Sequence, residues 1–235
     1  MAHTITATNH WDIDRIRPLV DTAIAATITE FDDLGARAIL TPSNLTFALL
    51  DRPPANFGWD YAQAFTTQHG AGRVELLAPS SHGSFAPDGF APSFDRVWYH
   101  RNLIHECTSV FMWSFDGQKD QGWRLNSAPS WFVEGVQEYV AVERAAADAR
   151  NRYRTRYFPR LREETVAADF GHVAEKYADG YLVLRFMYDD FGPTAVHKVL
   201  ASPVLSFWGA VEASFGIDRK QLFGRWLKWR IANAP

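Results

Sequence analysis

The chain has 235 residues, of which 47% are hydrophobic and 22% charged, and its formal net charge is −3. A chain of this length and composition can bury a sizeable core, which excludes intrinsic disorder, collagen-like repeats and coiled coil. Lys and Arg form no run longer than a pair, so the sequence lacks the basic stripe that phosphate binding requires and no nucleic-acid partner is expected.

Aromatic residues are abundant, with 9 Trp, 8 Tyr and 17 Phe spread along the chain. The single cysteine, Cys107, cannot form an intramolecular disulfide, which favours a reducing compartment and a small core residue at this position. The N-terminal segment has no signal-peptide pattern, and no apolar run approaches the about 20 residues that span a bilayer. We therefore expect a cytoplasmic protein with no membrane contact.

Strand character is confined to the N-terminal part, residues 1–92. Apolar residues at three- and four-residue spacings predict a helix from Trp11 to about Leu34, which Gly35 ends. The other elements predicted for this part are a strand at 37–42, a short helix at 44–50, a strand at 73–78 and an irregular surface loop at 79–93.

Residues 93–235 are predicted to be mainly helical. Strands that come early and helices that come late indicate an α+β fold, with a small N-terminal sheet packed on a helical body, rather than alternating units with a parallel sheet. No linker and no repeat divides the chain, so a single domain over 1–235 is expected. The predicted helices span about 94–115, 130–152, 173–191, 193–201, 203–214 and 218–232.

The helix at 94–115 carries a polar face. At about 100° per residue, five side chains share an arc of about 100°, and apolar residues occupy the opposite side. The arc contains no lysine and includes a tryptophan, so we expect it to line a cleft, with a solvated helix face as the alternative. Its members are Asn102, His105, Glu106, Ser109 and Trp113.

The next predicted helix carries two carboxylates and a tryptophan on one stripe. Trp131, Glu134 and Glu138 lie within about 60° of one another. Phe132 and Val133 flank Glu134, an unusual setting for a solvating charge. The stripe is therefore either an exposed acidic face or part of a site.

Six arginines follow this helix, between residues 150 and 162. We expect a solvated connector in which they pair with Glu163, Glu164 and Glu175. A cluster that clamps a carboxylate is the alternative.

Two segments carry a family resemblance: HECTS at 105–109 and PSWFVEGVQEY at 129–139. They resemble the peptidase MA-like, gluzincin group of zinc metallopeptidases, whose pattern is HExxH on one helix and W-x-x-E-G-x-x-E-Y on the next. The resemblance extends to residues 177–192 and 223–226 and to the strands at 37–42 and 73–78, so it covers most of the chain. It implies a metallopeptidase-like domain.

The resemblance also implies roles for individual residues. It makes His105 and Glu134 zinc ligands, Glu106 the general base, Glu138 the carboxylate that orients His105, and Tyr177 a hydrogen-bond donor to developing negative charge. Packing of Tyr177 on the core is the alternative for that residue.

The pattern is degenerate, because Ser109 stands where the family has its second histidine. A catalytic zinc site uses three protein ligands, and His105 with Glu134 supplies two. His100 lies about 140° round the helix from His105 and cannot replace the missing ligand. His82 or His172 remains available as a substitute from elsewhere in the fold, so zinc is kept as an unfavoured cofactor and no other is expected.

Without metal, the same residues still allow acid–base chemistry. His105, Glu106, Glu134 and Glu138 titrate, and Asn102 and Ser109 offer hydrogen bonds. We expect a metallopeptidase-like enzyme with a dismantled zinc site, acting by acid–base chemistry or residual amide or ester hydrolysis on a small molecule or peptide in a cleft walled by Trp113 and Trp131. The alternatives are a non-catalytic pseudopeptidase that binds a peptide or apolar ligand, and a zinc metallopeptidase with an unrecognised third ligand. No feature indicates an oligomeric state.

Overall fold

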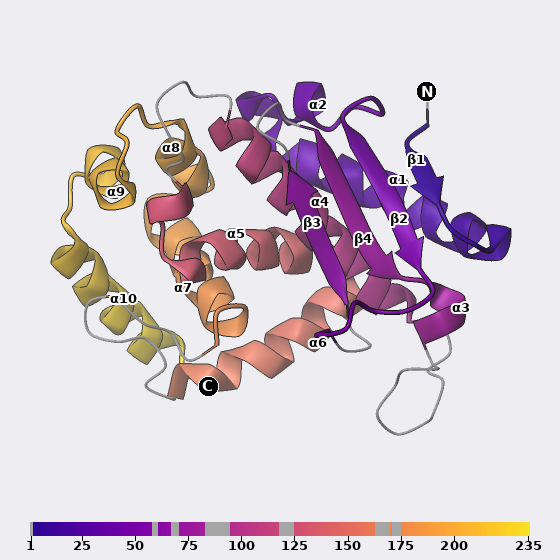
Figure 1. Cartoon of the computed structure of the whole chain (residues 1–235). Helices are drawn as coiled ribbons and strands as arrows, with labels where there is room; N and C mark the ends of the chain where they lie inside the picture. The colour runs from indigo at the N-terminus through magenta and orange to yellow at the C-terminus, as the bar shows by residue number, and fades with distance from the viewer. Residues whose placement is uncertain are drawn as a thin grey trace. The chain divides into compact units, whose positions relative to one another are not determined.

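The computed structural model describes residues 2–57, 61–66, 71–82, 95–117, 125–162, 170 and 175–235. The chain divides into two compact units, Met1–Gln118 and Lys119–Pro235. In the described residues the first unit contains a small sheet with helices, and the second is helical (Figure 1). The predicted α+β fold, mainly helical with a small N-terminal sheet, is confirmed at this level.

The sheet of the first unit has the strand order β1-β2-β4-β3 in the described residues. β2 is parallel to both of its neighbours, whereas β3 lies antiparallel to β4 at an edge. The helix α1 (His10–Phe31) connects β1 to the adjacent parallel strand β2, so this part of the sheet departs from the expectation of a fold without alternating units and parallel strands. β1 is only three residues long, which leaves too little sequence pattern to predict it. The strands are β1 (Thr4–Thr6), β2 (Leu45–Leu50), β3 (Ala62–Thr66) and β4 (Gly72–Leu77).

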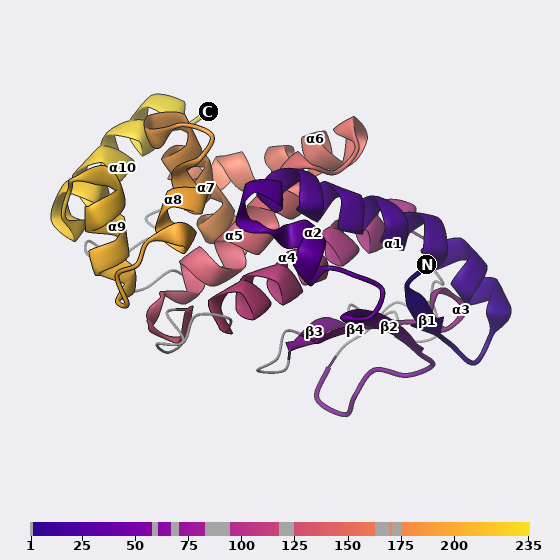
Figure 2. The same cartoon turned by 90° about the horizontal axis from the view of Figure 1, so that it is seen from above.

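The two long helices of this unit, α1 (His10–Phe31) and α4 (Arg96–Gly117), cover the same face of the sheet (Figure 2). Their predicted positions are confirmed. α1 continues into a 3₁₀ turn (Asp32–Leu34) that ends at Gly35, whose φ of 81° favours glycine. Phe31 of α1 stacks on Phe111 of α4 with ring centroids 4.6 Å apart, which fixes α4 in the core of the unit.

Two short elements are opposite to their predictions. The strand expected at 37–42 is a helical turn, α2 (Ala36–Ile39), closed by a hydrogen bond from the Leu40 N–H to the Ala36 carbonyl. The helix expected at 44–50 is the strand β2. Its Leu, Phe and Ala residues suit either state, and pairing on both sides with β1 and β4 decides for the strand. Of the loop expected at 79–93, Pro79–His82 forms the short helix α3, and 83–93 lie outside the described residues.

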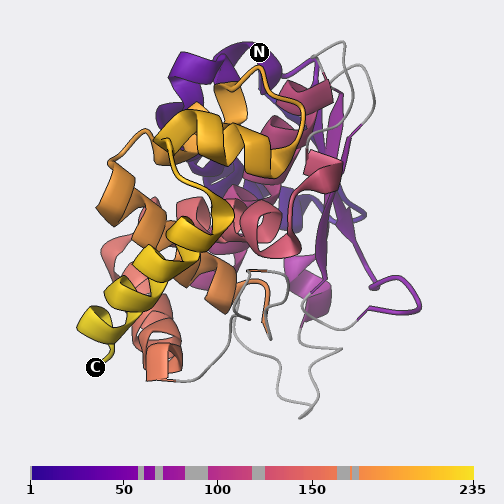
Figure 3. The same ribbon diagram turned by 90° about the vertical axis from the view of Figure 1, so that its left-hand side faces the viewer.

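The second unit is built from helices in its described part, and α10, in yellow, runs along the front of this unit in Figure 3. Its late helices confirm their predictions. The helix expected at 130–152 is divided in two around Arg144 and Ala145, and the one expected from 173 begins at Ala178. The helices are α5 (Ser130–Glu143), α6 (Ala147–Tyr157), α7 (Ala178–Phe191), α8 (Ala195–Ala201), α9 (Phe207–Phe215) and α10 (Arg219–Asn233).

α5 and α7 pack with their backbones almost in contact. A Cβ atom added to Gly180 would lie 2.6 Å from the Trp131 carbonyl oxygen and 2.8 Å from the Gly135 Cα. This spacing leaves room only for glycine on both helices. The N-terminal turn of α7 is therefore held directly against the first turns of α5.

Tryptophans of α10 pack against the core of this unit. Trp226 is 1% exposed and packs on Phe186, with ring centroids 5.9 Å apart, and Trp229 stacks on Trp226 at 5.6 Å.

Among the residues that the structure describes, none of the helices combines the length and apolar character of a membrane span.

Candidate functional site

The polar face of α4 is buried. Asn102, His105, Glu106 and Ser109 are between 4% and 8% exposed, so the alternative of a solvated helix face is wrong. Burying polar side chains costs free energy unless they are bonded or used. The four side chains therefore form a candidate polar site on α4, and Trp113, on the same arc, is half-buried.

The amide of Asn102 is engaged at both ends. Its Nδ2 donates to the Trp98 carbonyl at 2.9 Å, and its Oδ1 accepts from Arg101 Nη1 at 2.6 Å. Both partners lie on α4 itself. These bonds orient Asn102 within the helix, and its expected role in binding a substrate stays a prediction.

The sheet supplies a tyrosine–carboxylate pair close to α4. Tyr61, directly before β3, is 3% exposed, and its hydroxyl donates to Glu75 Oε2 of β4 at 3.1 Å. Arg73 Nε binds the other oxygen of Glu75 at 2.8 Å. Burial, the bond to Glu75 and the charges of Glu75 and Glu106 raise the pKa of Tyr61, against a smaller opposing effect of Arg73. Tyr61 is therefore a protonated phenol within electrostatic reach of Glu106.

The sequence pattern does not single out this pair, because it predicts the strand of Glu75 but not β3, next to which Tyr61 lies. The alternation in YAQAFT at 61–66 was the available signal, since side chains of a strand alternate between its two faces. The contact between Tyr61 and Glu75 also needs the β3–β4 pairing, which places Gln63 opposite Glu75.

Cys107 is fully buried beside Glu106 on α4. Burial, together with the Glu106 charge, raises the pKa of its thiol far above the ordinary value. The prediction of a small core residue is confirmed, and the thiol is unsuited to nucleophilic chemistry.

In the second unit, Glu134 forms an ion pair with Lys176. The Lys176 Nζ lies 2.6 Å from Glu134 Oε1, and 4.9 Å from the ring centroid of Tyr177. Burial by itself lowers the pKa of the Lys176 ammonium, but the hydrogen bond and charge of Glu134 outweigh it, so the pKa lies above its ordinary value. Tyr177 is 37% exposed, which overturns the alternative of a core tyrosine.

The other two residues of the α5 stripe are buried. Glu138 is 0% exposed and accepts a hydrogen bond from the Tyr157 hydroxyl at 2.7 Å, so the reading of an exposed acidic stripe is wrong for this residue. Trp131 is 1% exposed, and its Nε1 donates to the Phe170 carbonyl at 3.0 Å. Trp131 also packs on Phe207, with ring centroids 5.9 Å apart. These contacts are those of a core residue, and they lend no support to its expected place in a ligand cleft.

Arg154 and Arg160, two of these arginines, bind carboxylates inside the helical unit rather than in a solvated connector. Arg154 Nε donates to Glu143 Oε1 at 3.0 Å, and the Tyr181 hydroxyl donates to the same oxygen at 2.7 Å. Arg160 Nε donates to the fully buried Asp179 at 2.8 Å. The expected pairing with Glu163 and Glu164 lies outside the described residues.

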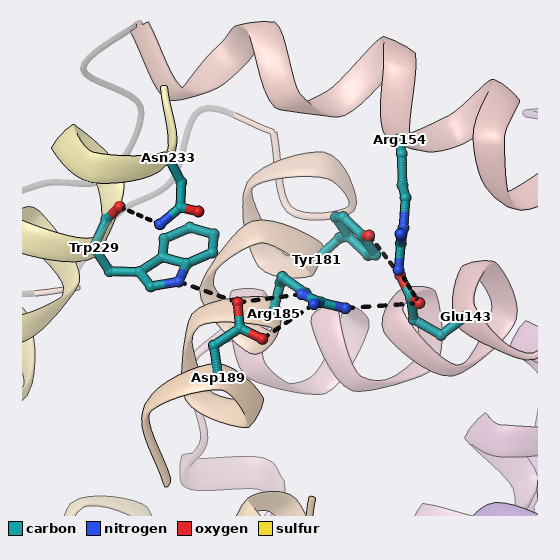
Figure 4. Close-up of polar contacts among 7 residues, drawn as sticks. All are labelled: Glu143, Arg154, Tyr181, Arg185, Asp189, Trp229 and Asn233. Carbon is teal, nitrogen blue, oxygen red and sulfur yellow. Dashed lines mark hydrogen bonds and ion pairs between the residues drawn. The ribbon is translucent and has the colours of Figure 1, made fainter. Parts of the chain in front are cut away.

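The contacts of Glu143 with Arg154 and Tyr181 continue through further side chains of α7 to α10 (Figure 4). Arg185 Nη1 lies 3.8 Å from Glu143 Oε2, and its Nη2 lies 3.1 Å from Asp189 Oδ1. Trp229 Nε1 donates to Asp189 Oδ2 at 3.1 Å. The opposite charges alternate along this chain of contacts, so we interpret it as a structural network that joins α5, α6, α7 and α10.

The zinc ion that the resemblance implies does not fit these residues. Ser109 occupies the place of the second histidine, and the Glu134 carboxylate is bound by Lys176. Within the ranges that the structure describes, no group of three or more His, Cys, Asp and Glu side chains is placed to hold a metal ion. His172 and the side chain of His82, the two proposed substitutes, lie outside those ranges.

His100 makes the stability of the fold depend on pH. Burial, with a smaller effect of Arg96, lowers its pKa below 6.5, and its Nε2 is buried with no hydrogen-bond partner among the described residues. The unfolded chain therefore binds a proton that the folded chain resists. The contribution of the neutral His100 imidazole to the free energy of unfolding is fully present above pH 6.5. It is lost as the pH falls from 6.5 towards the lowered pKa.

We expect His100→Gln to lose less stability than the wild type when the pH is lowered from about 7.5 to about 5. Thermal unfolding of both proteins at the two pH values measures this difference. Equal losses in the two proteins would show that His100 does not carry the effect.

The two units, each taken by itself, offer different chemistry. The first has a buried imidazole and carboxylate, His105 and Glu106, which can accept and donate protons. The second has an accessible ammonium and phenol, Lys176 and Tyr177, which can donate hydrogen bonds to a negatively charged oxygen.

Comparison of the chain with family models, with curated proteins and with solved structures finds no match.

Proposed function

We propose that the chain is a metallopeptidase-like enzyme that works without zinc and performs acid–base chemistry on a small molecule or a peptide. Hydrolysis of an amide or ester bond is the reaction that this chemistry serves most directly. The gluzincin-type pattern of HECTS at 105–109 and PSWFVEGVQEY at 129–139 supports the choice of class. Nucleic acids and membranes are not among the proposed partners.

The burial of His105 and Glu106 on adjacent positions of α4 carries the proposal. Both side chains are more than nine-tenths buried, on a helix whose buried residues also include Leu103, Ile104, Val110, Phe111 and Met112. A core position gains stability from an apolar side chain, whereas an imidazole and a carboxylate lose hydration there. A functional role accounts for the presence of His105 and Glu106 at these buried positions.

Glu106 is the proposed general base, which takes a proton from the attacking water or from the substrate. His105 is the neighbouring proton acceptor or donor, and Ser109, one helical turn further, is a candidate hydrogen-bonding group for the substrate. Tyr61 lies within reach of the Glu106 charge, and its phenol proton is donated to Glu75 of β4.

In the second unit, the exposure of Tyr177 supports its proposed role as a donor to developing negative charge. Glu138 is proposed as a positioning residue, because its carboxylate is buried and held by Tyr157. The free and buried Cys107 supports placement of the enzyme in the reducing cytoplasm.

The proposal is tested with chromogenic aryl esters and aminoacyl anilides. We expect Glu106→Gln to lower kcat about 100-fold, because glutamine keeps the shape of the side chain but accepts no proton. We expect a chelator to leave the wild-type rate unchanged. The matched control is Glu212→Gln on the exposed surface of α9, which should retain full activity.

Turnover by Glu106→Gln at the wild-type rate would contradict the proposed base. Loss of activity on chelation would restore the zinc metallopeptidase alternative. Tight ligand binding that survives Glu106→Gln, with no turnover by either protein, would establish the pseudopeptidase instead.

A further inference from the structure

Glu134 is the residue of the second unit to which the resemblance assigns a metal ion. Its carboxylate, 20% exposed, instead holds the ammonium of Lys176, with 2.6 Å between Nζ and Oε1. This is the length of a short charge-assisted hydrogen bond. The positive charge beside Glu134 therefore comes from the chain itself.

The backbone positions this lysine on Glu134. Gly180 of α7 lies against the backbone of Trp131 and Gly135 on α5, so the segment just before α7 begins beside the first turns of α5. Lys176 is in that segment and Glu134 is in those turns. The close packing of α5 and α7 therefore places the Lys176 and Glu134 side chains near each other.

The segment that carries Lys176 is itself tied down. The Glu175 N–H donates to Asp179 Oδ2 at 2.9 Å, and the Tyr177 N–H donates to Glu175 Oε1 at 2.9 Å. Asp179 is fully buried and bound by Arg160. Lys176 lies between these anchored residues, so less conformational entropy is lost when its ammonium binds Glu134 than in a surface pair on a free segment.

A metal ion and the Lys176 ammonium compete for the same carboxylate. Zinc binds a carboxylate oxygen at about 2.0 to 2.2 Å, and two cations this close to one oxygen repel each other strongly. Zinc must therefore displace Lys176 before it can bind Oε1 of Glu134.

We infer that Lys176 is a resident counter-cation that takes the place of the metal ion at Glu134. The inference rests on the metallopeptidase-like design of the proposed function. It adds that the positive charge beside Glu134 is an ammonium, whose N–H donors lie next to Tyr177. The test of this inference needs no substrate, whereas the test of the proposed function measures turnover. The failure of one can therefore be distinguished from the failure of the other.

The test is competitive acetylation of the intact chain with a trace of acetic anhydride, read by peptide mass spectrometry. An amine held by a carboxylate keeps its proton and reacts slowly. We expect Lys176 to be acetylated about tenfold more slowly than Lys198, an exposed lysine of α8 that serves as reference in the same sample. In Glu134→Gln we expect the two lysines to react at similar rates.

Zinc chloride provides a second measurement on the wild type, which needs no folded variant. We expect Lys176 to remain protected when zinc is added in excess. The inference is overturned if zinc raises the acetylation of Lys176 to the level in Glu134→Gln, because the metal has then displaced the lysine. It is also overturned if Lys176 and Lys198 react equally in the wild type, or if Glu134→Gln leaves Lys176 protected.

Discussion

Replacement of Gly180 by alanine is expected to destabilise the helical unit by about 3 kcal/mol, as overpacking of a tightly packed contact does. The added methyl group would lie 2.6 Å from the Trp131 carbonyl oxygen and 2.8 Å from the Gly135 Cα. Both obstacles are backbone atoms of α5, so α7 has to move as a whole. Thermal unfolding followed by circular dichroism should show a Tm lower by about 10 °C.

Gly224→Ala is the matched control. Gly224 also lies inside a helix, α10, but a Cβ atom added there has no neighbour within 4 Å. Alanine at this position should leave the Tm unchanged or raise it, because it reduces the entropy of the unfolded chain. Equal stability of Gly180→Ala and the wild type would refute the close α5–α7 packing.

Removal of the Asp179 carboxylate is the second change with a large expected effect. Asp179 is fully buried, and it accepts hydrogen bonds from Arg160 Nε at 2.8 Å and from the Glu175 N–H at 2.9 Å. Asp179→Ala leaves both donors without this acceptor, at a cost of about 3 kcal/mol. Urea unfolding should show a lower midpoint with an unchanged slope.

Asp190→Ala supplies the comparison for an exposed pair. Asp190 lies 3.1 Å from Arg225, but both side chains are about a third exposed or more. Its loss should cost less than about 1 kcal/mol, because water replaces the lost partner. If the two variants were equally stable, burial of Asp179 would not be the cause of its effect.

The site residues were predictable by type, and their partners were not. His105 and Glu106 are recognisable from the spacing in HECTS, and Glu134 and Glu138 from that in WFVEGVQEY. The partners Lys176 and Tyr157 lie 42 and 19 residues from the carboxylates that they bind. No local pattern encodes such a contact, because it depends on how the helices pack.

The same limit applies to burial. The arc of α4 around His105 was recognisable as polar, and a polar arc on an isolated helix is normally hydrated. Whether it is covered depends on the neighbours that α4 meets. The tertiary structure buries it to 8% exposure or less, and this is what makes the arc a candidate site.

The long helices are predictable from sequence alone, because their signals are local. α1 and α4 follow from apolar periodicity, and α10 also has a capping box, in which Asp218 and Gln221 satisfy each other's backbone N–H groups. The strand at Leu45–Leu50 and the pairing of Glu134 with Lys176 depend instead on tertiary contacts. Both depend on partners far along the chain, and such contacts form only when the whole unit folds.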